Sequence, residues 1–201
     1  NGVKKMLYHF LKFVIGIYYK IAFSFRLVGL ENIPKEGAAV LCCNHRSNYD
    51  PVTVSVFLDR MPRFIAKKEL FSVPVVKQIL VNLGSFPVDR EATMDMKAVR
   101  QAVKVLKEGD LLGVFAEGTR VKDGEKADAK GGVALFALKG DAPIIPIAIS
   151  GRYGFRQKLT MTVGKPIYLD EYKGKKLSAA MLEEIADKTM QTIYEMRDQA
   201  Q

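Results

Sequence analysis

Residues 38–58 read AAVLCCNHRSNYDPVTVSVFL, and this stretch decides the fold class. Its first six residues are apolar and suit a buried strand, whereas Asp50-Pro51 is typical of a helix start, with Asp as the N-cap and Pro at the first helical position. Short apolar runs alternate with amphipathic stretches along the rest of the chain, which is typical of an α/β domain. We therefore expect one α/β domain over residues 28–201, with a mixed, largely parallel central sheet flanked by helices.

The composition excludes several classes of protein. Hydrophobic residues make up 48% of the 201 residues and charged residues 26%, which rules out wholesale disorder, and the 16 glycines and 8 prolines follow no repeat. The two cysteines, Cys42 and Cys43, are adjacent and cannot cross-link the fold, and no Cys/His group has zinc-ligand spacing.

The positive charge is concentrated at the N-terminus. The net charge is +9, and residues 1–30 contain five basic residues and no acidic one. Such a charge indicates a polyanionic partner. Because these bases stand among aromatic and aliphatic residues, we expect an anionic membrane surface and no nucleic acid.

Residues 1–27 are expected to form an amphipathic, membrane-associating helix. On a helix the residues Lys5, His9, Lys12, Gly16, Lys20 and Ser24 make one narrow polar stripe, and nearly everything else is apolar. The lysines interrupt the run of about 20 apolar residues that a spanning helix needs, and no small-residue cleavage site indicates a signal peptide. We expect the helix to lie in the headgroup region, with its lysines toward anionic lipid. The alternative is a helix packed on the core of its own domain.

The loop after the first strand carries a candidate general base. His45 and Asp50 are five residues apart, so the carboxylate can reach one imidazole nitrogen while the other acts as a base. Neither cysteine can serve as a nucleophile, because both lie on the preceding strand. The pair therefore suits direct deprotonation of a substrate hydroxyl. The alternative is a helix-capping Asp beside an incidental histidine.

Two further loops are candidates for a phosphate site. Glu117-Gly118-Thr119-Arg120 follows an apolar strand at 111–116, and Gly84 to Arg90 ends another strand. The glycine lets backbone amides approach a ligand, and each arginine offers a planar fork for phosphate oxygens. The alternative is that both arginines are solvated and paired with Asp89 or Glu117.

Four segments in this order resemble the lysophosphatidate acyltransferases (1-acylglycerol-3-phosphate O-acyltransferases), within the glycerolipid acyltransferases. The segments are the His-x4-Asp of 45–50, the stretch from Gly84 to Arg90, Glu-Gly-Thr-Arg at 117–120 and the Pro-rich apolar strand 142–147. The resemblance covers about residues 28–170. Ala116, Val121 and Pro87 depart from the family pattern, and these departures concern substrate preference more than reaction type.

The resemblance implies transfer of an acyl chain from acyl-CoA or acyl-carrier protein to the free sn-2 hydroxyl of 1-acylglycerol 3-phosphate, giving phosphatidic acid. His45 would be the general base and Asp50 its partner, and the acceptor would be bound by Arg90, Glu117, Gly118, Thr119 and Arg120. The resemblance implies no cofactor and no metal, and a peripheral or monotopic protein at the cytoplasmic face of the membrane. Lys122, Lys126 and Lys130 suit either the donor's anionic carrier or a solvated loop. The alternatives are another lysolipid or glycerol phosphate acceptor, or a non-catalytic protein that binds anionic lipid.

Overall fold

The apolar runs form one seven-stranded sheet in the computed structural model, which describes residues 2–89, 95–122, 125–127 and 129–200. The strands are β1 (Ser24–Val28), β2 (Ala39–Cys43), β3 (Arg63–Lys67), β4 (Phe86–Val88), β5 (Leu111–Phe115), β6 (Ile144–Gly151) and β7 (Lys158–Val163). Their order is β1-β7-β6-β2-β5-β3-β4, and the strands from β6 to β4 are parallel. β7 runs antiparallel to β6, and β1 pairs parallel with β7. The expected mixed, largely parallel sheet is confirmed.

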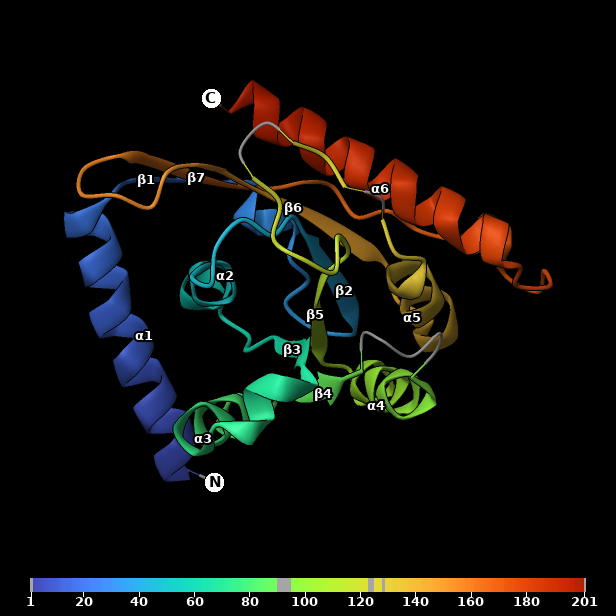
Figure 1. Ribbon diagram of the computed structural model, residues 1–201, viewed down its shortest axis with the longest axis horizontal. Coiled ribbons are helices and arrows are strands. Elements are labelled where there is room, and N and C mark those ends of the chain that lie inside the picture. The colour runs from blue at the N-terminus through green and yellow to red at the C-terminus, as the bar shows by residue number, and fades with distance from the viewer. Residues whose placement is uncertain (1, 90–94, 123–124, 128, 201) are drawn as a thin grey trace.

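Helices cover both faces of this sheet (Figure 1). They are α1 (Gly2–Ala22), α2 (Asp50–Phe57), α3 (Pro74–Asn82), α4 (Met96–Lys107), α5 (Gly132–Gly140) and α6 (Ala179–Gln199), with short 3-10 turns η1 (Leu30–Asn32), η2 (Lys68–Ser72) and η3 (Asp170–Tyr172). Because side chains alternate along a strand, β2 supplies both cores. Leu41 packs in the core beneath α1 and α2, and Val40 in the core beneath α4, α5 and α6.

The N-terminal helix is shorter than expected. α1 ends at Ala22, and residues 24–28 form the edge strand β1, in which exposed and half-buried side chains alternate. The prediction of a helix over the whole of 1–27 is therefore wrong at its C-terminal end. The expected boundary between residues 27 and 28 falls inside β1, a strand of the main sheet.

α1 packs on the domain through its more polar side. Tyr19 and Ala22 are buried, and a side chain at Gly16 would meet Val56 of α2. The Lys12 ammonium donates to the Leu58 carbonyl and lies 3.6 Å from the Asp59 carboxylate. The expectation that the lysine stripe faces lipid is therefore wrong for Lys12, which binds the end of α2 instead.

The opposite side of α1 is apolar and open to solvent. Its exposed side chains follow helical spacing and are Phe10, Phe13, Val14, Ile17, Tyr18 and Ile21. We call these six residues the outer face of α1. One side of the helix thus packs on the core, as the alternative expected, and the other has no protein cover among the described residues. Contact of that side with a membrane stays a prediction. No helix in the described part of the chain is long and apolar enough to cross a membrane.

Candidate active site

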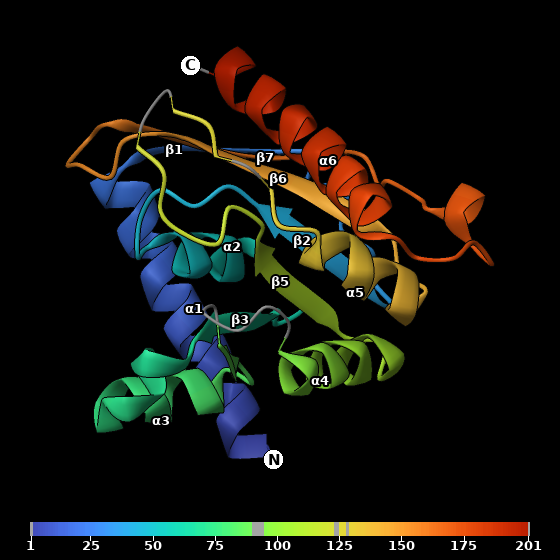
Figure 2. The same cartoon turned by 45° about the vertical axis from the view of Figure 1, so that its right-hand side comes forward.

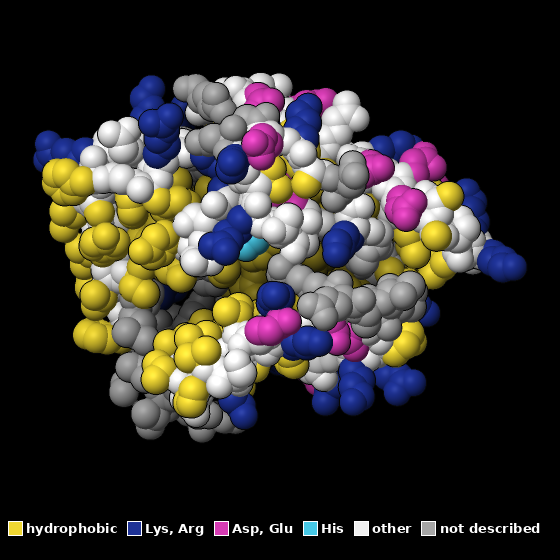
Figure 3. Space-filling view, in the orientation of Figure 1, with side chains coloured by type: hydrophobic (Ala, Val, Ile, Leu, Met, Phe, Trp, Pro, Cys, Tyr) yellow, Lys and Arg dark blue, Asp and Glu magenta, His cyan; other side chains and the backbone are white. Residues whose placement is uncertain are grey.

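His45 and Asp50 meet at the carboxyl end of β2, where the chain turns into α2. The His45 Nδ1 atom lies 2.9 Å from Asp50 Oδ2, and Oδ2 also accepts the backbone N–H groups of Arg46 and Ser47, each at 2.6 Å. The Asp50 side chain is fully buried, and the His45 side chain is 13% exposed. Figure 3 shows a histidine at the surface of a hollow in this face of the molecule.

The Asp-Pro pair predicts Asp50 as the N-cap of α2, and this prediction is wrong. Tyr49 is the N-cap of α2, and Asp50 is the first helical residue. Its carboxylate turns back into the loop instead, because two backbone N–H groups and the imidazole converge on one oxygen. The loop thus holds the imidazole through a carboxylate oxygen whose position is fixed by two backbone N–H groups.

Tyr153 also contacts Asp50, and no pattern in the sequence predicts this contact. Its hydroxyl donates to Asp50 Oδ1 at 2.7 Å, from the connection between β6 and β7. Burial, and next the negative charge of Asp50, raise the pKa of Tyr153, so the phenol stays protonated and remains a donor. Tyr153 also lies 2.8 Å from Thr53 Oγ1 in α2, and Thr53 lies 2.9 Å from the Tyr19 hydroxyl in α1. We call this series the tyrosine relay; it runs from Asp50 to the N-terminal helix.

The imidazole is also held by aromatic packing. The His45 ring stacks on Phe115, the last residue of β5, with a centroid distance of 4.3 Å. Phe115 stacks in turn on Phe64 of β3 at 5.5 Å. Stacking fixes the plane of the ring, and the bond to Asp50 fixes its rotation, so the position of His45 Nε2 is set by the fold.

Glu117 is placed to hold this loop. Its Oε2 accepts the backbone N–H of His45 at 2.5 Å, and its Oε1 accepts the Tyr194 hydroxyl of α6 at 2.7 Å. The residue is buried, and burial raises the pKa of its carboxyl group. Both carboxylate oxygens of Glu117 are therefore engaged by the protein, and the side chain links the His45 loop to α6.

The remaining residues of the second motif lie on the open side. Gly118 has a φ of +67°, which a side chain would strain, and Thr119 and Arg120 are exposed. Arg120 Nη1 donates to the Asn48 side chain at 3.1 Å, and the N–H of Val121 donates to the His45 carbonyl at 2.8 Å. The structure therefore brings the predicted loop 117–120 against the loop that carries His45 and Asp50. Arg90, the second predicted clamp residue, lies outside the described residues.

We call His45 and Asp50 the dyad. The loop that carries them is anchored to the neighbouring strand β6 by Asn44. The buried side chain of Asn44 donates to the Ile149 carbonyl at 3.0 Å and accepts the Ile149 N–H at 2.7 Å. A side-chain amide imitates a peptide group in this way and extends the pairing between β2 and β6 past Cys43. Asn44 stands beside the motif in the sequence, but only the structure reveals this role.

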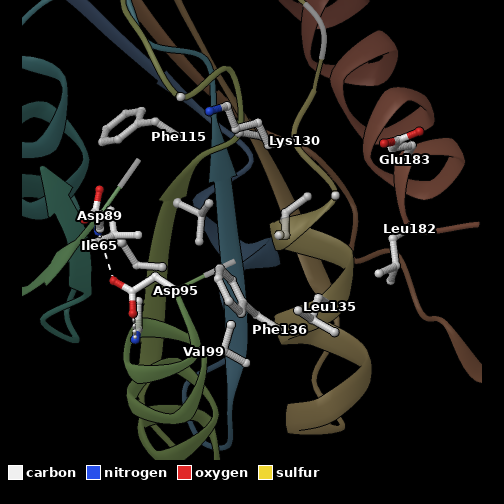
Figure 4. Close-up of a pocket in the computed structure, with 18 of the residues that line it drawn as sticks. Ile65, Asp89, Asp95, Val99, Phe115, Lys130, Leu135, Phe136, Leu182 and Glu183 are labelled. Carbon is white, nitrogen blue, oxygen red and sulfur yellow. Dashed lines mark hydrogen bonds between the residues drawn. The ribbon is translucent and has the colours of Figure 1, made fainter. Parts of the chain in front are cut away.

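A cavity of about 500 Å³ opens beside the dyad, between β5, α4, α5 and α6 (Figure 4). Its lining includes Phe115, on which the His45 ring stacks, together with Gly118, Lys130 and apolar side chains such as Val99 and Phe136. Asp89, Asp95 and Glu183 are the acidic residues of the lining. Most of the wall is therefore apolar, and its charged groups are few.

The cysteines are unsuited to nucleophilic chemistry. Both are fully buried in β2; burial raises the pKa of Cys42 to about 12 and that of Cys43 well above its ordinary value. Neither thiol ionises near neutral pH, and the thiolate is the reactive form. Among the described residues no group of three His, Cys, Asp or Glu side chains could hold a metal ion.

Several known proteins that are similar to this chain carry the name acyltransferase. A model of the Acyltransferase family matches residues 24–150. The chain is 30% identical to a 1-acyl-sn-glycerol-3-phosphate acyltransferase of Bacillus subtilis, over 88% of this chain and 92% of that protein. It is 29% identical to the enzyme of that name from Streptococcus pneumoniae, over 97% of this chain and 74% of the other. Its fold matches the crystal structure of the 1-acyl-sn-glycerophosphate (LPA) acyltransferase PlsC from Thermotoga maritima, with a TM-score of 0.64, 26% identity, and coverage of 86% of this chain and 72% of that one.

Proposed function

The chain belongs to the acyltransferase family, and we propose that it transfers an acyl chain from acyl-CoA or acyl-carrier protein to the sn-2 hydroxyl of 1-acylglycerol 3-phosphate, giving phosphatidic acid. The observation that carries the proposal is the His45–Asp50 pair, held by the backbone and by Tyr153 beside a mostly apolar cavity. A histidine paired with a buried carboxylate is suited to take a proton from a hydroxyl.

In the proposed reaction His45 Nε2 accepts the proton of the acceptor hydroxyl, because Nδ1 is engaged by Asp50. The hydroxyl oxygen attacks the thioester carbonyl, and the tetrahedral intermediate collapses with loss of the thiolate. The imidazolium returns its proton to the thiolate, so the enzyme ends in its starting state. Asp50 holds the tautomer and stabilises the imidazolium. The high pKa values of the cysteine thiols support direct transfer, without an acyl-enzyme on either sulfur.

Arg120 is proposed to bind the phosphate of the acceptor. Its guanidinium is exposed and touches Asn48, within the loop that carries the dyad, so a phosphate bound there would lie near His45. The backbone between Gly118 and Thr119 and the Thr119 hydroxyl would add hydrogen-bond donors to the phosphate. Arg90 is assigned the same role from the sequence alone. Glu117 is proposed to position His45.

The cavity is proposed to receive the acyl chain. Its wall is mostly apolar and includes Phe115, the residue on which the imidazole stacks. A chain lying in the cavity would therefore present its carbonyl end toward the dyad. Apolar burial is the natural source of affinity for such a chain.

α1 is proposed to hold the enzyme on the cytoplasmic face of the membrane, as a peripheral or monotopic anchor within residues 1–27. The support is its outer face, which leaves three aromatic side chains, Phe10, Phe13 and Tyr18, exposed on one side of the helix. The acceptor and the product are lipids, whereas the thioester donor is soluble, so an enzyme at the interface meets both.

The experiment that tests the function measures release of free CoA from acyl-CoA in the presence of lysophosphatidate, with and without EDTA. We expect release that depends on the acceptor and does not change with EDTA. A panel of acceptors separates the alternatives: turnover with another lysolipid or with glycerol phosphate only would change the substrate. Binding to anionic lipid without turnover of any acceptor would contradict the assignment as an enzyme.

A further inference from the structure

The segment formed by η2 and α3 leaves most of its apolar side chains exposed in the described part of the structure. None of the nine residues of α3 is buried, although its sequence is PVVKQILVN. Leu70, Val73 and Val81 are exposed, and the exposed fractions of Val75 and Ile79 are 71% and 54%. A surface helix normally turns its apolar stripe toward the core, and exposed apolar surface of this extent marks an interaction site.

This segment lies close to α1. Figures 1 and 2 both place α3 beside the N-terminal half of α1. Figure 3 shows apolar side chains over both regions, on the same side of the hollow that contains the histidine. η2 begins at the carboxyl end of β3, which is the edge of the sheet where β2 leads into His45. The two apolar surfaces therefore border one approach to the dyad.

The charges of this segment suit an anionic surface. Residues 70–88 contain no Asp or Glu and one Lys, Lys77, which is exposed on α3. A negatively charged bilayer would therefore meet no carboxylate on this part of the chain. The neighbouring carboxylates before and after it, Glu69 and Asp89, are paired with Lys67 at 3.5 Å and Lys68 at 2.7 Å.

We infer that η2 and α3 form a second membrane-contacting surface, which inserts Val75 and Ile79 into the same anionic bilayer as the outer face of α1. The inference rests on the proposed function, in which the acceptor lies in the bilayer. A single helix at the interface leaves the domain able to rotate about the helix axis. A second contact removes that rotation and fixes the side of the molecule that carries His45 toward the lipid.

Tryptophan reporters test this directly, because the chain has no tryptophan. The full-length variants Val75→Trp and Ile79→Trp are mixed with vesicles of phosphatidylglycerol and phosphatidylcholine, with or without brominated acyl chains. Tyr168→Trp is the matched control, because Tyr168 is an exposed aromatic residue next to η3, away from α3. We expect the emission of Trp at 75 and 79 to shift to shorter wavelength and to be quenched by the brominated chains, while Trp at 168 changes little.

Three outcomes overturn the inference. Trp at 75 and 79 can behave like Trp at 168, which would mean that α3 stays in water. Their emission can shift with protein concentration in the absence of vesicles, which would mean that a second copy of the chain covers α3. Or both reporters can respond to vesicles of zwitterionic lipid as strongly as to anionic ones, which would remove the charge argument.

A second pair of variants links the surface to turnover. The double variant Val75→Glu/Ile79→Glu should weaken vesicle binding at least tenfold. The reason is that two apolar side chains are withdrawn from lipid and two negative charges are added. Transfer to an embedded acceptor should fall, while transfer to a short-chain, monomeric acceptor should not change. Met96→Glu, at the exposed first turn of α4, is the control. Equal losses on both acceptors would contradict the inference. Failure of the unaltered enzyme on the monomeric acceptor would instead contradict the proposed function, since the fluorescence measurement requires no activity.

Discussion

Replacing Asp50 by Asn separates the charge of this residue from its hydrogen bonds. The Asn oxygen can still accept the N–H groups of Arg46 and Ser47 and the imidazole N–H, which now converge on Oδ2. The Asn amide would then face the Tyr153 hydroxyl, which can accept from it and donate to Thr53. The main change at the site is therefore loss of the negative charge beside the imidazole.

The expected fall in kcat follows from the distance between the imidazolium and the Asp50 carboxylate. Nδ1 and Oδ2 are in contact at 2.9 Å, so the two charge centres of the ion pair lie about 4 Å apart. At an effective dielectric constant of about 20 this interaction contributes about 4 kcal/mol when the imidazolium forms, which corresponds to about 10³-fold in rate. We expect kcat to fall by about that factor and KM to change little, because the charge matters only once the proton has moved.

The assay is release of free CoA, with circular dichroism to show that the variant is folded. Asp59→Asn is the matched control, since Asp59 is fully exposed after the end of α2 and its pairing with Lys12 is a surface interaction of small energy. A folded Asp50→Asn enzyme that loses only tenfold, or no more than the Asp59 variant, would refute the role of the charge. Asp50 would then be chiefly a residue that shapes the loop.

Four further variants test the other assignments. His45→Ala should lower kcat by about 10²- to 10⁴-fold while vesicle binding and folding are kept, and near-normal transfer would exclude the general base. Arg120→Ala should raise KM for a phosphate-bearing acceptor more than KM for the thioester, and the reverse pattern would assign this arginine to the donor. Tyr153→Phe should lower kcat about tenfold, since one buried carboxylate oxygen loses its donor; an unchanged kcat would show that the backbone N–H groups suffice. Burial raises the pKa of Glu117, so its contribution to stability is fully present below about pH 4.5 and is lost as the pH rises through the raised value. Glu117→Gln should therefore gain stability relative to the unaltered protein across that rise, in thermal melts at several pH values, and a constant difference would contradict the shift.

The strand after residue 38 and the pairing of His45 with Asp50 are predictable because each depends on local sequence. The apolar run 38–43 had to be a strand, and a five-residue spacing lets the carboxylate return to the imidazole. The same local reasoning failed at Asp50 as a cap, since it did not include the competing N–H groups of the loop. It also failed at residues 24–28, whose apolar character suited the end of a helix as well as a strand. Pairing with β7, more than 100 residues away, decides the outcome there.

The residues that support the dyad from a distance could not be predicted. Three tyrosines from separate parts of the fold make these contacts: Tyr153 with Asp50, Tyr194 with Glu117 and Tyr19 with Thr53. Nothing in the sequence around a tyrosine indicates which distant residue its hydroxyl will contact. The side of α1 that faces the domain could not be predicted either. The stripe of polar residues predicts two sides of the helix, but only the contacts of Lys12 and Tyr19 show which side packs on the domain.

The tyrosine relay means that solubilisation is itself a perturbation of the dyad. Detergent that competes for α1 and draws it away from α2 would remove the Tyr19 hydroxyl from Thr53, and Thr53 would then be free to reorient toward Tyr153 or away from it. The far-ultraviolet spectrum of the sheet would not report such a change. Loss of turnover on extraction would then have a chemical origin two hydrogen bonds from Asp50, and adding more acceptor would not restore it.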